Sequence, residues 1–173
     1  EGVAQQINQI TSYIDASNVY GSDQEKSEHL RALYGGYLLT SDGLDNLDPE
    51  ESGNGDFLPF NTLGLENASP PFTGTGVPIT PDQLFVAGDV RSNEQPGLTS
   101  LHTLFAREHN YQAQRLAEEL GLRAEALSDP EVDEYIFQVA RAIVGAEVQS
   151  ITYNEFIPAL FGPEQLESYG GYQ

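Results

Sequence analysis

The stretch "AGDVRSNEQPGLTSLHTLFAREHN", residues 87–110, contains the change from an irregular segment to a long helix. Its second half places apolar residues at three- and four-residue steps, which predicts a helix from Thr99 to about Gly121. Arg91 stands just before this helix, between acidic neighbours, in a chain of net charge -20. An arginine among acids usually forms an ion pair, but a permanent cation can also serve a reaction. Both interpretations stay open at this point.

A second long helix is predicted to begin at Pro130, because proline suits the first helical position. Apolar residues cover much of its circumference as far as Val148, which indicates that it is buried. The stretch "NEFIPALFG" (154–162) predicts a short further helix that is broken near Pro158. No segment has a convincing strand pattern, so the predicted fold class is mainly α.

The first half of the chain is less regular. Ser22 followed by Glu25 is a capping-box pattern, and it predicts a helix over 22–36 with Gly35 as its left-handed terminating residue. Residues 37–82 are rich in Gly, Pro, Asp and Asn. This composition predicts a long irregular surface loop, which is uncommon within a compact domain.

Composition limits the classes of protein to consider. A chain of 173 residues with 39% hydrophobic content suits one domain, and neither a membrane span nor a signal peptide is visible. Twenty-seven acidic residues against seven Lys and Arg argue against nucleic-acid and anionic-membrane partners. The chain has no Cys and no Met. Loss of these oxidisable residues would suit a protein that makes oxidants, although chance composition is the simpler explanation.

The three histidines do not form a catalytic or metal-binding motif. His29 is expected on the exposed side of the first helix, and His102 and His109 lie seven residues apart in the long helix. The sequence around them lacks the H-E-x-x-H pattern of zinc proteases. A structural role is therefore the expected one for all three.

The stretch "TSYIDAS" (11–17) is a candidate cation site. Its alternate residues are Thr11, Tyr13, Asp15 and Ser17, and in an extended backbone alternate residues share one side. Hydroxyl, carboxylate and carbonyl oxygens are the ligands that Ca²⁺ prefers. One carboxylate is few for a tight site, so another would have to come from elsewhere. The simpler alternative is a polar turn before a helix.

Three stretches together resemble the animal-type haem peroxidase superfamily. They are "QINQITSYIDASNVYGS" (6–22), "FVAGDVRSNEQPGLTSLHTLFAREHN" (85–110) and "VARAIVGAEVQSITYNEFIPALFG" (139–162), and they follow one another in the order of the family. The resemblance implies a helical fold around haem b. It also implies that residues 1–173 are the central fragment of one peroxidase domain.

The resemblance assigns roles to particular residues. Arg91 matches the catalytic arginine, and Glu94 matches an acid that can form an ester with haem. Gln95 stands where some members have a Met that bonds a haem vinyl group, so that link cannot form here. The calcium site of the family would comprise side chains of the 11–17 loop together with main-chain oxygens of its first half, which gives the ligands Thr11, Tyr13, Asp15 and Ser17.

The implied protein is a secreted, calcium-binding haem peroxidase that uses hydrogen peroxide to oxidise halides or small organic donors. The family's distal and proximal histidines are expected outside residues 1–173, on adjoining sequence or a companion chain, so the isolated chain is expected to be inactive. His109 is not the family's haem ligand. Two alternatives remain: a fatty-acid dioxygenase of the same superfamily, which needs a radical-forming Tyr outside this chain, and a haem-free interaction module.

Overall fold

The computed structural model describes residues 11–42, 55–68 and 75–162. These ranges contain helices and irregular segments, with β-structure limited to isolated bridges. The mainly α prediction is therefore confirmed. Along the chain the helical elements are α1 (Ser17–Tyr20), α2 (Gln24–His29), the 3₁₀ turn η2 (Pro81–Gln83), α3 (Pro96–Glu119), α4 (Ala124–Leu127), α5 (Pro130–Ile151), the π-helical segment η3 (Thr152–Phe156) and α6 (Ile157–Phe161).

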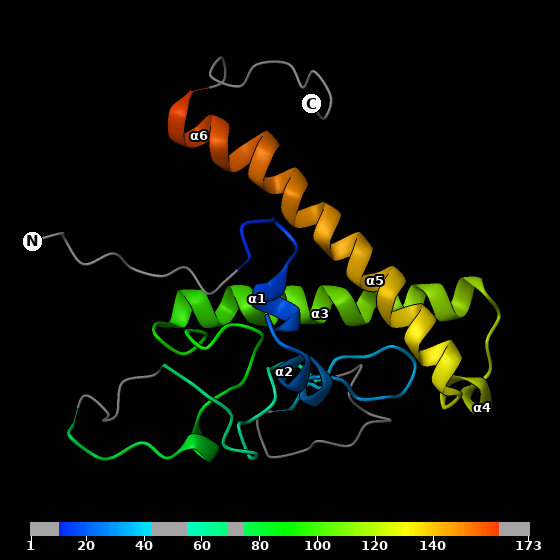
Figure 1. The fold of residues 1–173 in the computed structure, drawn as a ribbon, viewed down its shortest axis with the longest axis horizontal. Coiled ribbons are helices and arrows are strands. Elements are labelled where there is room, and N and C mark those ends of the chain that lie inside the picture. Colours follow the sequence, from blue (N-terminus) through cyan, green and yellow to red (C-terminus); the bar gives the residue numbers. More distant parts are fainter. Residues whose placement is uncertain (1–10, 43–54, 69–74, 163–173) are drawn as a thin grey trace, which may run out of the picture.

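The two long helices, α3 and α5, cross each other and form the framework of the fold (Figure 1). Where they meet, Ala113 of α3 packs in one buried cluster with Ile136 and Ala140 of α5. All three side chains are fully buried. The small side chains of Ala113 and Ala140 let the two helices approach closely, and Ile136 fills the space beside them, so this contact fixes the crossing.

Both long helices begin with a cap and a proline. The side chain of Gln95 accepts a hydrogen bond from the Gly97 amide at 2.8 Å, and Pro96 occupies the first turn of α3. Asp129 accepts from the first amides of α5, and Pro130 follows it. These partners satisfy amides that a helix start leaves unpaired. The predicted helices are confirmed, with α3 starting three residues earlier than expected.

The helix predicted over 22–36 is wrong at both ends. Asp23, not Ser22, is the N-cap, because its carboxylate accepts from the Lys26 amide at 2.8 Å, and α2 ends at His29. The chain then turns sharply, with Leu33 at φ 55° and Gly36 at φ 72°. Gly35 is left-handed as predicted, with φ 59°, although it does not end the helix. Left-handed residues cannot continue a helix, so the apolar spacing that suggested a longer one was misleading.

The reason for this turn is contact with α5. A Cβ atom added to Gly36 would lie 2.6 Å from the Phe137 amide nitrogen, so only glycine allows the chain to approach here. The Gly36 amide donates to the Asp133 carboxylate at 2.7 Å, and Arg31 also pairs with Asp133 at 2.7 Å. Tertiary contacts therefore end α2 early.

The described parts of 37–82 are irregular, as expected, but they do not all lie at the surface. Leu38 and Leu58 belong to the main buried cluster, and Asn61 is buried with them. The Asn61 side-chain amide donates to the Leu65 carbonyl and accepts from the Leu65 amide, both at 2.8 Å. These hydrogen bonds replace a regular ladder, which lets an irregular segment complete the core.

The break predicted near Pro158 is also wrong. The chain continues from α5 through the wider turn of η3 into α6, as the single line of ribbon in Figure 1 shows. Proline lacks an amide donor and its ring crowds the preceding turn, and a π-helical turn accommodates such a defect without stopping the helix. Within the described residues, no helix is both long and apolar enough to cross a membrane.

Candidate functional site

The turn before α3 brings Arg91 and Glu94 to the same part of the surface. The Ser92 amide donates to the Asp89 carbonyl at 3.2 Å, and the Glu94 amide donates to the Arg91 carbonyl at 2.9 Å. Ser92 is fully buried, whereas Arg91 and Glu94 are exposed. The two overlapping turns thus bury Ser92 and leave the charged side chains of Arg91 and Glu94 accessible.

Asp89 holds the Arg91 side chain by two charge-assisted hydrogen bonds. Arg91 Nε donates to Asp89 Oδ1 at 2.9 Å, and Nη2 donates to Oδ2 at 2.6 Å. The Arg91 amide also donates to Oδ1, at 2.8 Å. Hydrogen bonding from Arg91 lowers the pKa of Asp89 to about 2, and the same pairing raises the pKa of Arg91. The ion-pair interpretation is therefore correct, and it leaves part of the guanidinium accessible.

The Arg91 turn rests directly on α1. The Asp89 amide donates to the Asn18 carbonyl at 3.2 Å. A Cβ atom added to Gly88 would lie 2.4 Å from both the Ser17 carbonyl oxygen and the Gly21 amide nitrogen. No larger residue fits there without moving backbone. Gly88 therefore allows the turn and α1 to touch.

The 11–17 loop leads into α1 and is curved by its own side chains. Thr11 Oγ1 accepts from the Tyr13 amide at 3.1 Å, and Asp15 Oδ1 accepts from the Ser17 amide at 3.0 Å. Ala16 adopts a left-handed φ of 56°. Tyr13 is almost fully exposed, whereas Thr11, Asp15 and Ser17 are half-buried. The polar-turn interpretation is thus correct for the loop's hydrogen bonding.

The loop's donor set suits a hard cation but is incomplete. The described residues contain no group of three or more His, Cys, Asp or Glu side chains that could hold a metal ion. Asp15 is the one carboxylate among the four candidate residues, and the rest are hydroxyls and carbonyls. From α5, Gln149 Nε2 donates to the Ile14 carbonyl at 2.8 Å, which fixes the middle of the loop. Because the loop leads into α1 at Ser17 and the Arg91 turn packs against α1, this short helix connects the two.

The histidines have the structural roles expected of them. His109 is fully buried, and its Nε2 lies 2.7 Å from the Gly36 carbonyl oxygen, so Nε2 carries the proton and Nδ1 accepts from the Tyr20 hydroxyl at 3.0 Å. Burial lowers the pKa of His109 to about 4. His102 Nδ1 pairs with the Leu98 carbonyl at 2.9 Å, and exposed His29 pairs with the Glu25 carbonyl at 2.6 Å.

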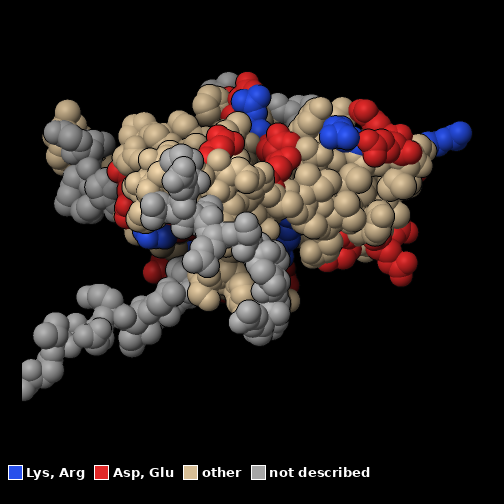
Figure 2. Space-filling model, turned by 90° about the horizontal axis from the view of Figure 1, so that it is seen from above, with Lys and Arg blue, Asp and Glu red and all other residues tan. Residues whose placement is uncertain are grey.

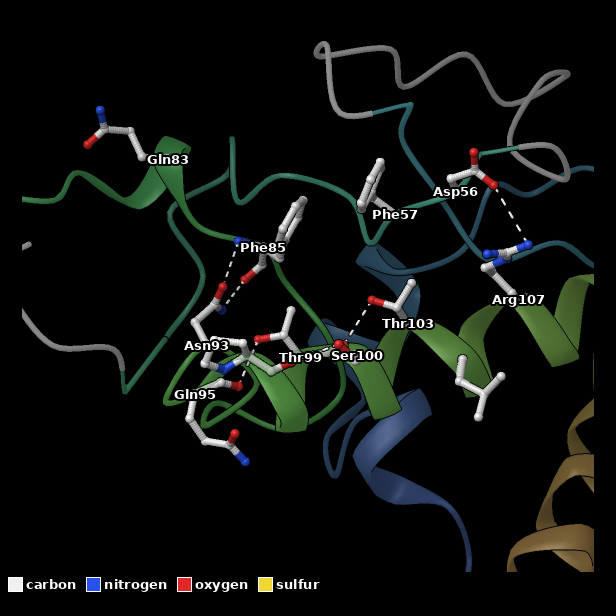
Figure 3. Close-up of a pocket in the computed structure, with 12 residues that line it drawn as sticks. Asp56, Phe57, Gln83, Phe85, Asn93, Gln95, Thr99, Ser100, Thr103 and Arg107 are labelled. Atoms are coloured by element: carbon white, nitrogen blue, oxygen red, sulfur yellow. Dashed lines mark hydrogen bonds and ion pairs between the residues drawn. The ribbon is translucent and has the colours of Figure 1, made fainter.

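A cleft of about 640 Å³ lies alongside the first three turns of α3 (Figure 3). Phe57 and Phe85 stack on its loop side, with ring centroids 6.2 Å apart. Gln95 lies at one end, and the exposed Arg107–Asp56 pair, at 3.7 Å, lies at the other. Sequence reasoning missed this cleft, because its walls come from segments about forty residues apart and no motif joins them.

Charge is distributed over the surface without a basic region on the face drawn in Figure 2. Acidic side chains occur there in several groups, with basic side chains between them, in agreement with the excess of 27 acids over seven Lys and Arg. Arg115 pairs with Glu119 at 3.2 Å, one turn along α3. Such exposed pairs add little stability.

The chain is similar to known haem proteins over its whole length. The sequence model described as "Animal haem peroxidase" matches residues 1–173. The chain is 41% identical to the human protein named "Peroxidasin homolog" over 174 aligned residues, which covers 97% of this chain and 10% of that protein. It is 39% identical to mouse myeloperoxidase over 168 residues, 96% of this chain and 21% of that protein.

Solved structures show the same fold. Peroxidase A from Dictyostelium discoideum aligns with a TM-score of 0.73 and 33% identity, over 98% of this chain and 28% of that one. Fatty acid alpha-dioxygenase from Oryza sativa aligns with a TM-score of 0.58 and 22% identity, over 87% of this chain and 18% of that one. The second likeness concerns the fold alone. This chain spans only a tenth to a fifth of the length of the peroxidasin and myeloperoxidase relatives.

Proposed function

The chain belongs to the animal haem peroxidase family, and from this membership we propose that it forms the central part of a peroxidase domain that uses hydrogen peroxide to oxidise halides or small organic donors. The observation that carries the proposal is the exposed Arg91 guanidinium, fixed by Asp89 on a turn that packs against α1. We also propose that the whole protein is secreted.

The residues around Arg91 fit one wall of a haem site. An exposed cation, Arg91, and an exposed acid, Glu94, lie on one turn, and the exposed apolar side chain of Leu101 follows within the first two turns of α3. Haem b is a flat apolar ring with charged groups at its edge, and an exposed cation, an exposed acid and an exposed apolar side chain are the kinds of group that would line it. Haem b, when bound, supplies the oxidising chemistry with peroxide.

Arg91 has the chemistry to stabilise negative charge on the peroxide oxygen that departs as the O–O bond breaks. A guanidinium does not deprotonate, so it can donate hydrogen bonds without taking part in proton transfer. Family resemblance assigns that proton transfer to a histidine outside residues 1–173. Pairing with Asp89 leaves Arg91 charged and oriented, which suits this division of roles.

Replacing Arg91 tests the proposal. In the haem-loaded protein, Arg91→Lys should slow the reaction with peroxide about 10²–10³-fold, because a point charge does not replace a planar fork. The rate would be followed as the change in the Soret band after rapid mixing. Arg107→Lys is the matched control, since Arg107 is also exposed and paired with a single carboxylate. Equal rates for Arg91→Lys and the control would refute the assignment.

The same spectrum separates the alternatives. A protein without a Soret band after purification and haem supplementation would be the haem-free module. A haem protein that consumes oxygen with fatty acid but does not turn over peroxide would be a dioxygenase. The likeness to plant alpha-dioxygenases gives the fold and does not favour that activity.

Glu94 is proposed to form an ester with haem. In that step a C–H carbon at the haem edge would lose one proton and two electrons to peroxide, which is reduced to water, and the carboxylate oxygen would bond to that carbon. Its exposure on the Arg91 turn makes its carboxylate accessible to a bound ligand. Extraction with acid and organic solvent under denaturing conditions should then leave haem on the polypeptide, and Glu94→Gln should reduce that fraction. Complete release of haem from the unsubstituted protein would contradict the ester.

The 11–17 loop is proposed to bind Ca²⁺. Side-chain oxygens of Thr11, Asp15 and Ser17, with main-chain oxygens of Thr11 and Tyr13, would supply part of the roughly six to eight ligands that Ca²⁺ needs. Asp15→Ala should lose the ion and lower the melting temperature, since a ligand bound only by the folded state stabilises it. Asp82→Ala, at an exposed acid of η2, is the control. Equal calcium content in the two variants would exclude the site.

A further inference from the structure

We propose that Asp89 is the positioning residue for Arg91, and that its own position is set by α1. The inference rests on the proposed function of Arg91 and adds a residue to it. Asp89 does not touch the reacting atoms in this arrangement. It acts through the orientation of the guanidinium.

The pairing fixes one edge of the guanidinium and leaves the other accessible. A guanidinium has five N–H donors in a rigid plane. Two of them, one on Nε and one on Nη2, bond to Asp89, which leaves three that point away from it. Because the group is planar, fixing the Nε–Nη2 edge also fixes the direction of Nη1. Asp89 thus determines where the remaining donors point.

Arg91 needs such a partner because its side chain is otherwise poorly confined. The Arg91 side chain is 55% exposed, whereas the Asp89 side chain is only 13% exposed. Within the described residues, Asp89 is the only carboxylate paired with Arg91. An exposed arginine that lost this contact would sample many rotamers, and holding it in one orientation would then cost side-chain conformational entropy.

Asp89 itself is fixed by main-chain contacts on both sides. Its amide donates to the Asn18 carbonyl of α1, and its carbonyl accepts from the Ser92 amide, both at 3.2 Å. The preceding Gly88 lies so close to α1 that a Cβ atom would meet the backbone at 2.4 Å. The main chain that carries the Asp89 carboxylate therefore cannot shift without moving α1.

A pair of variants tests the inference in the haem-loaded protein. Asp89→Asn keeps the shape of the side chain but removes the charge that holds the fork. Its reaction with peroxide should slow by about 10- to 10²-fold, because a misplaced catalytic group costs that much in rate. Fluoride affinity for the ferric haem, measured by absorption titration, should fall about 10-fold, since a charge-assisted donor would no longer face the anion. Asp56→Asn, in the exposed Arg107 pair, should leave both quantities unchanged.

A double-mutant cycle distinguishes positioning from a merely structural role. If Asp89 acts through Arg91, adding Asp89→Asn to Arg91→Lys should change the fluoride affinity by less than about 2-fold. Full additivity of the two single effects would overturn the inference. So would an Asp89→Asn variant that binds fluoride as tightly as the unsubstituted protein, while Arg91→Lys binds it more weakly.

Two further outcomes are decided by the same measurements. If Arg91→Lys alone changes neither fluoride affinity nor peroxide rate, the proposed role of Arg91 fails, and the role of Asp89 fails with it. If Asp89→Asn does not retain haem, Asp89→Glu is measured in its place, since it keeps the charge but displaces the carboxylate by one methylene. Fluoride affinity at least about 3-fold weaker would support positioning, and unchanged affinity would overturn it.

Discussion

Buried His109 should make the stability of the fold depend on pH between about 6.5 and 4. Its ring is fully buried, Nε2 donates to the Gly36 carbonyl, and Nδ1 accepts from the Tyr20 hydroxyl. Protonation of Nδ1 would place a second donor against that hydroxyl and an uncompensated charge in the core. Burial, the nearby Arg31 and the nearby Arg141 lower the pKa of His109 to about 4, although the bond to Gly36 acts in the opposite direction.

The direction and size of the effect follow from proton linkage. The unfolded chain takes up this proton near the ordinary pKa of about 6.5, whereas the folded protein does so only near 4. Between these values the unfolded state binds more protons, so the free energy of unfolding falls as the pH falls. The difference is roughly 2.5 pKa units, or about 3 kcal/mol lost across the window, with a slope approaching 1.4 kcal/mol per pH unit.

Urea denaturation at half-unit steps from pH 7.5 to pH 4 would measure this loss in the intact protein. His109→Gln removes the titration but keeps a donor and an acceptor, so its free energy of unfolding should be lower at pH 7 and should vary about 3 kcal/mol less across the window. His29→Gln, at an exposed histidine, should retain the full dependence. Parallel pH profiles for His109→Gln and the unsubstituted protein would refute the reasoning.

Four further substitutions test the packing. Gly36→Ala combines a left-handed φ with a 2.6 Å clash and should cost more than about 3 kcal/mol in thermal or urea unfolding, whereas Gly64→Ala, left-handed but in open space, should cost about 1–2 kcal/mol. Gly88→Ala should destabilise by about 1–3 kcal/mol and also weaken fluoride binding, because it separates the Arg91 turn from α1; loss of neither property would contradict the contact. Tyr20→Phe should cost about 1–3 kcal/mol in urea unfolding by leaving the buried His109 Nδ1 without a donor, and a cost below about 0.5 kcal/mol would show that this bond is not needed.

The long helices could be predicted because their signals are local. The spacing of apolar residues predicted where α3 and α5 lie to within a few residues, and Pro130 predicted the start of α5. The end of α2 could not be predicted in this way. It depends on a left-handed turn at Gly36 that fits against Phe137, a residue about a hundred positions later. Spacing within a short window carries no information about such a contact.

The interior part of 37–82 was missed for a related reason. Its composition correctly indicated irregular backbone, and irregular backbone usually lies at the surface because its polar groups need water. Here the Asn61 side chain pairs with both main-chain groups of Leu65, so a polar residue takes the place of water. Leu38 and Leu58 can then be buried. The composition of a segment predicts its regularity better than its depth.

The candidate site shows the same division between local and distant signals. Arg91, Glu94 and the 11–17 loop could be proposed from the sequence, since each lies in a recognisable stretch. Their connection could not, because it is a contact between backbones about seventy residues apart, where Gly88 and Asp89 meet α1. From the sequence, Asp89 could be identified only as an acidic residue two positions before Arg91. The two parallel hydrogen bonds from the Arg91 guanidinium to its carboxylate became evident only in the structure.

This connection has a consequence for how the two parts of the site depend on each other. The four-residue helix α1 begins at Ser17, the last residue of the proposed calcium loop, and its main chain accepts the bond from Asp89. A helix this short has little stability of its own, so its position depends on what surrounds it. That support comes from the loop at its start, which Gln149 holds by a hydrogen bond, and from the close contact with Gly88. Disorder in the 11–17 loop would therefore displace α1, and with it Asp89 and the Arg91 guanidinium that Asp89 holds. An ordered loop would stabilise the orientation of the guanidinium.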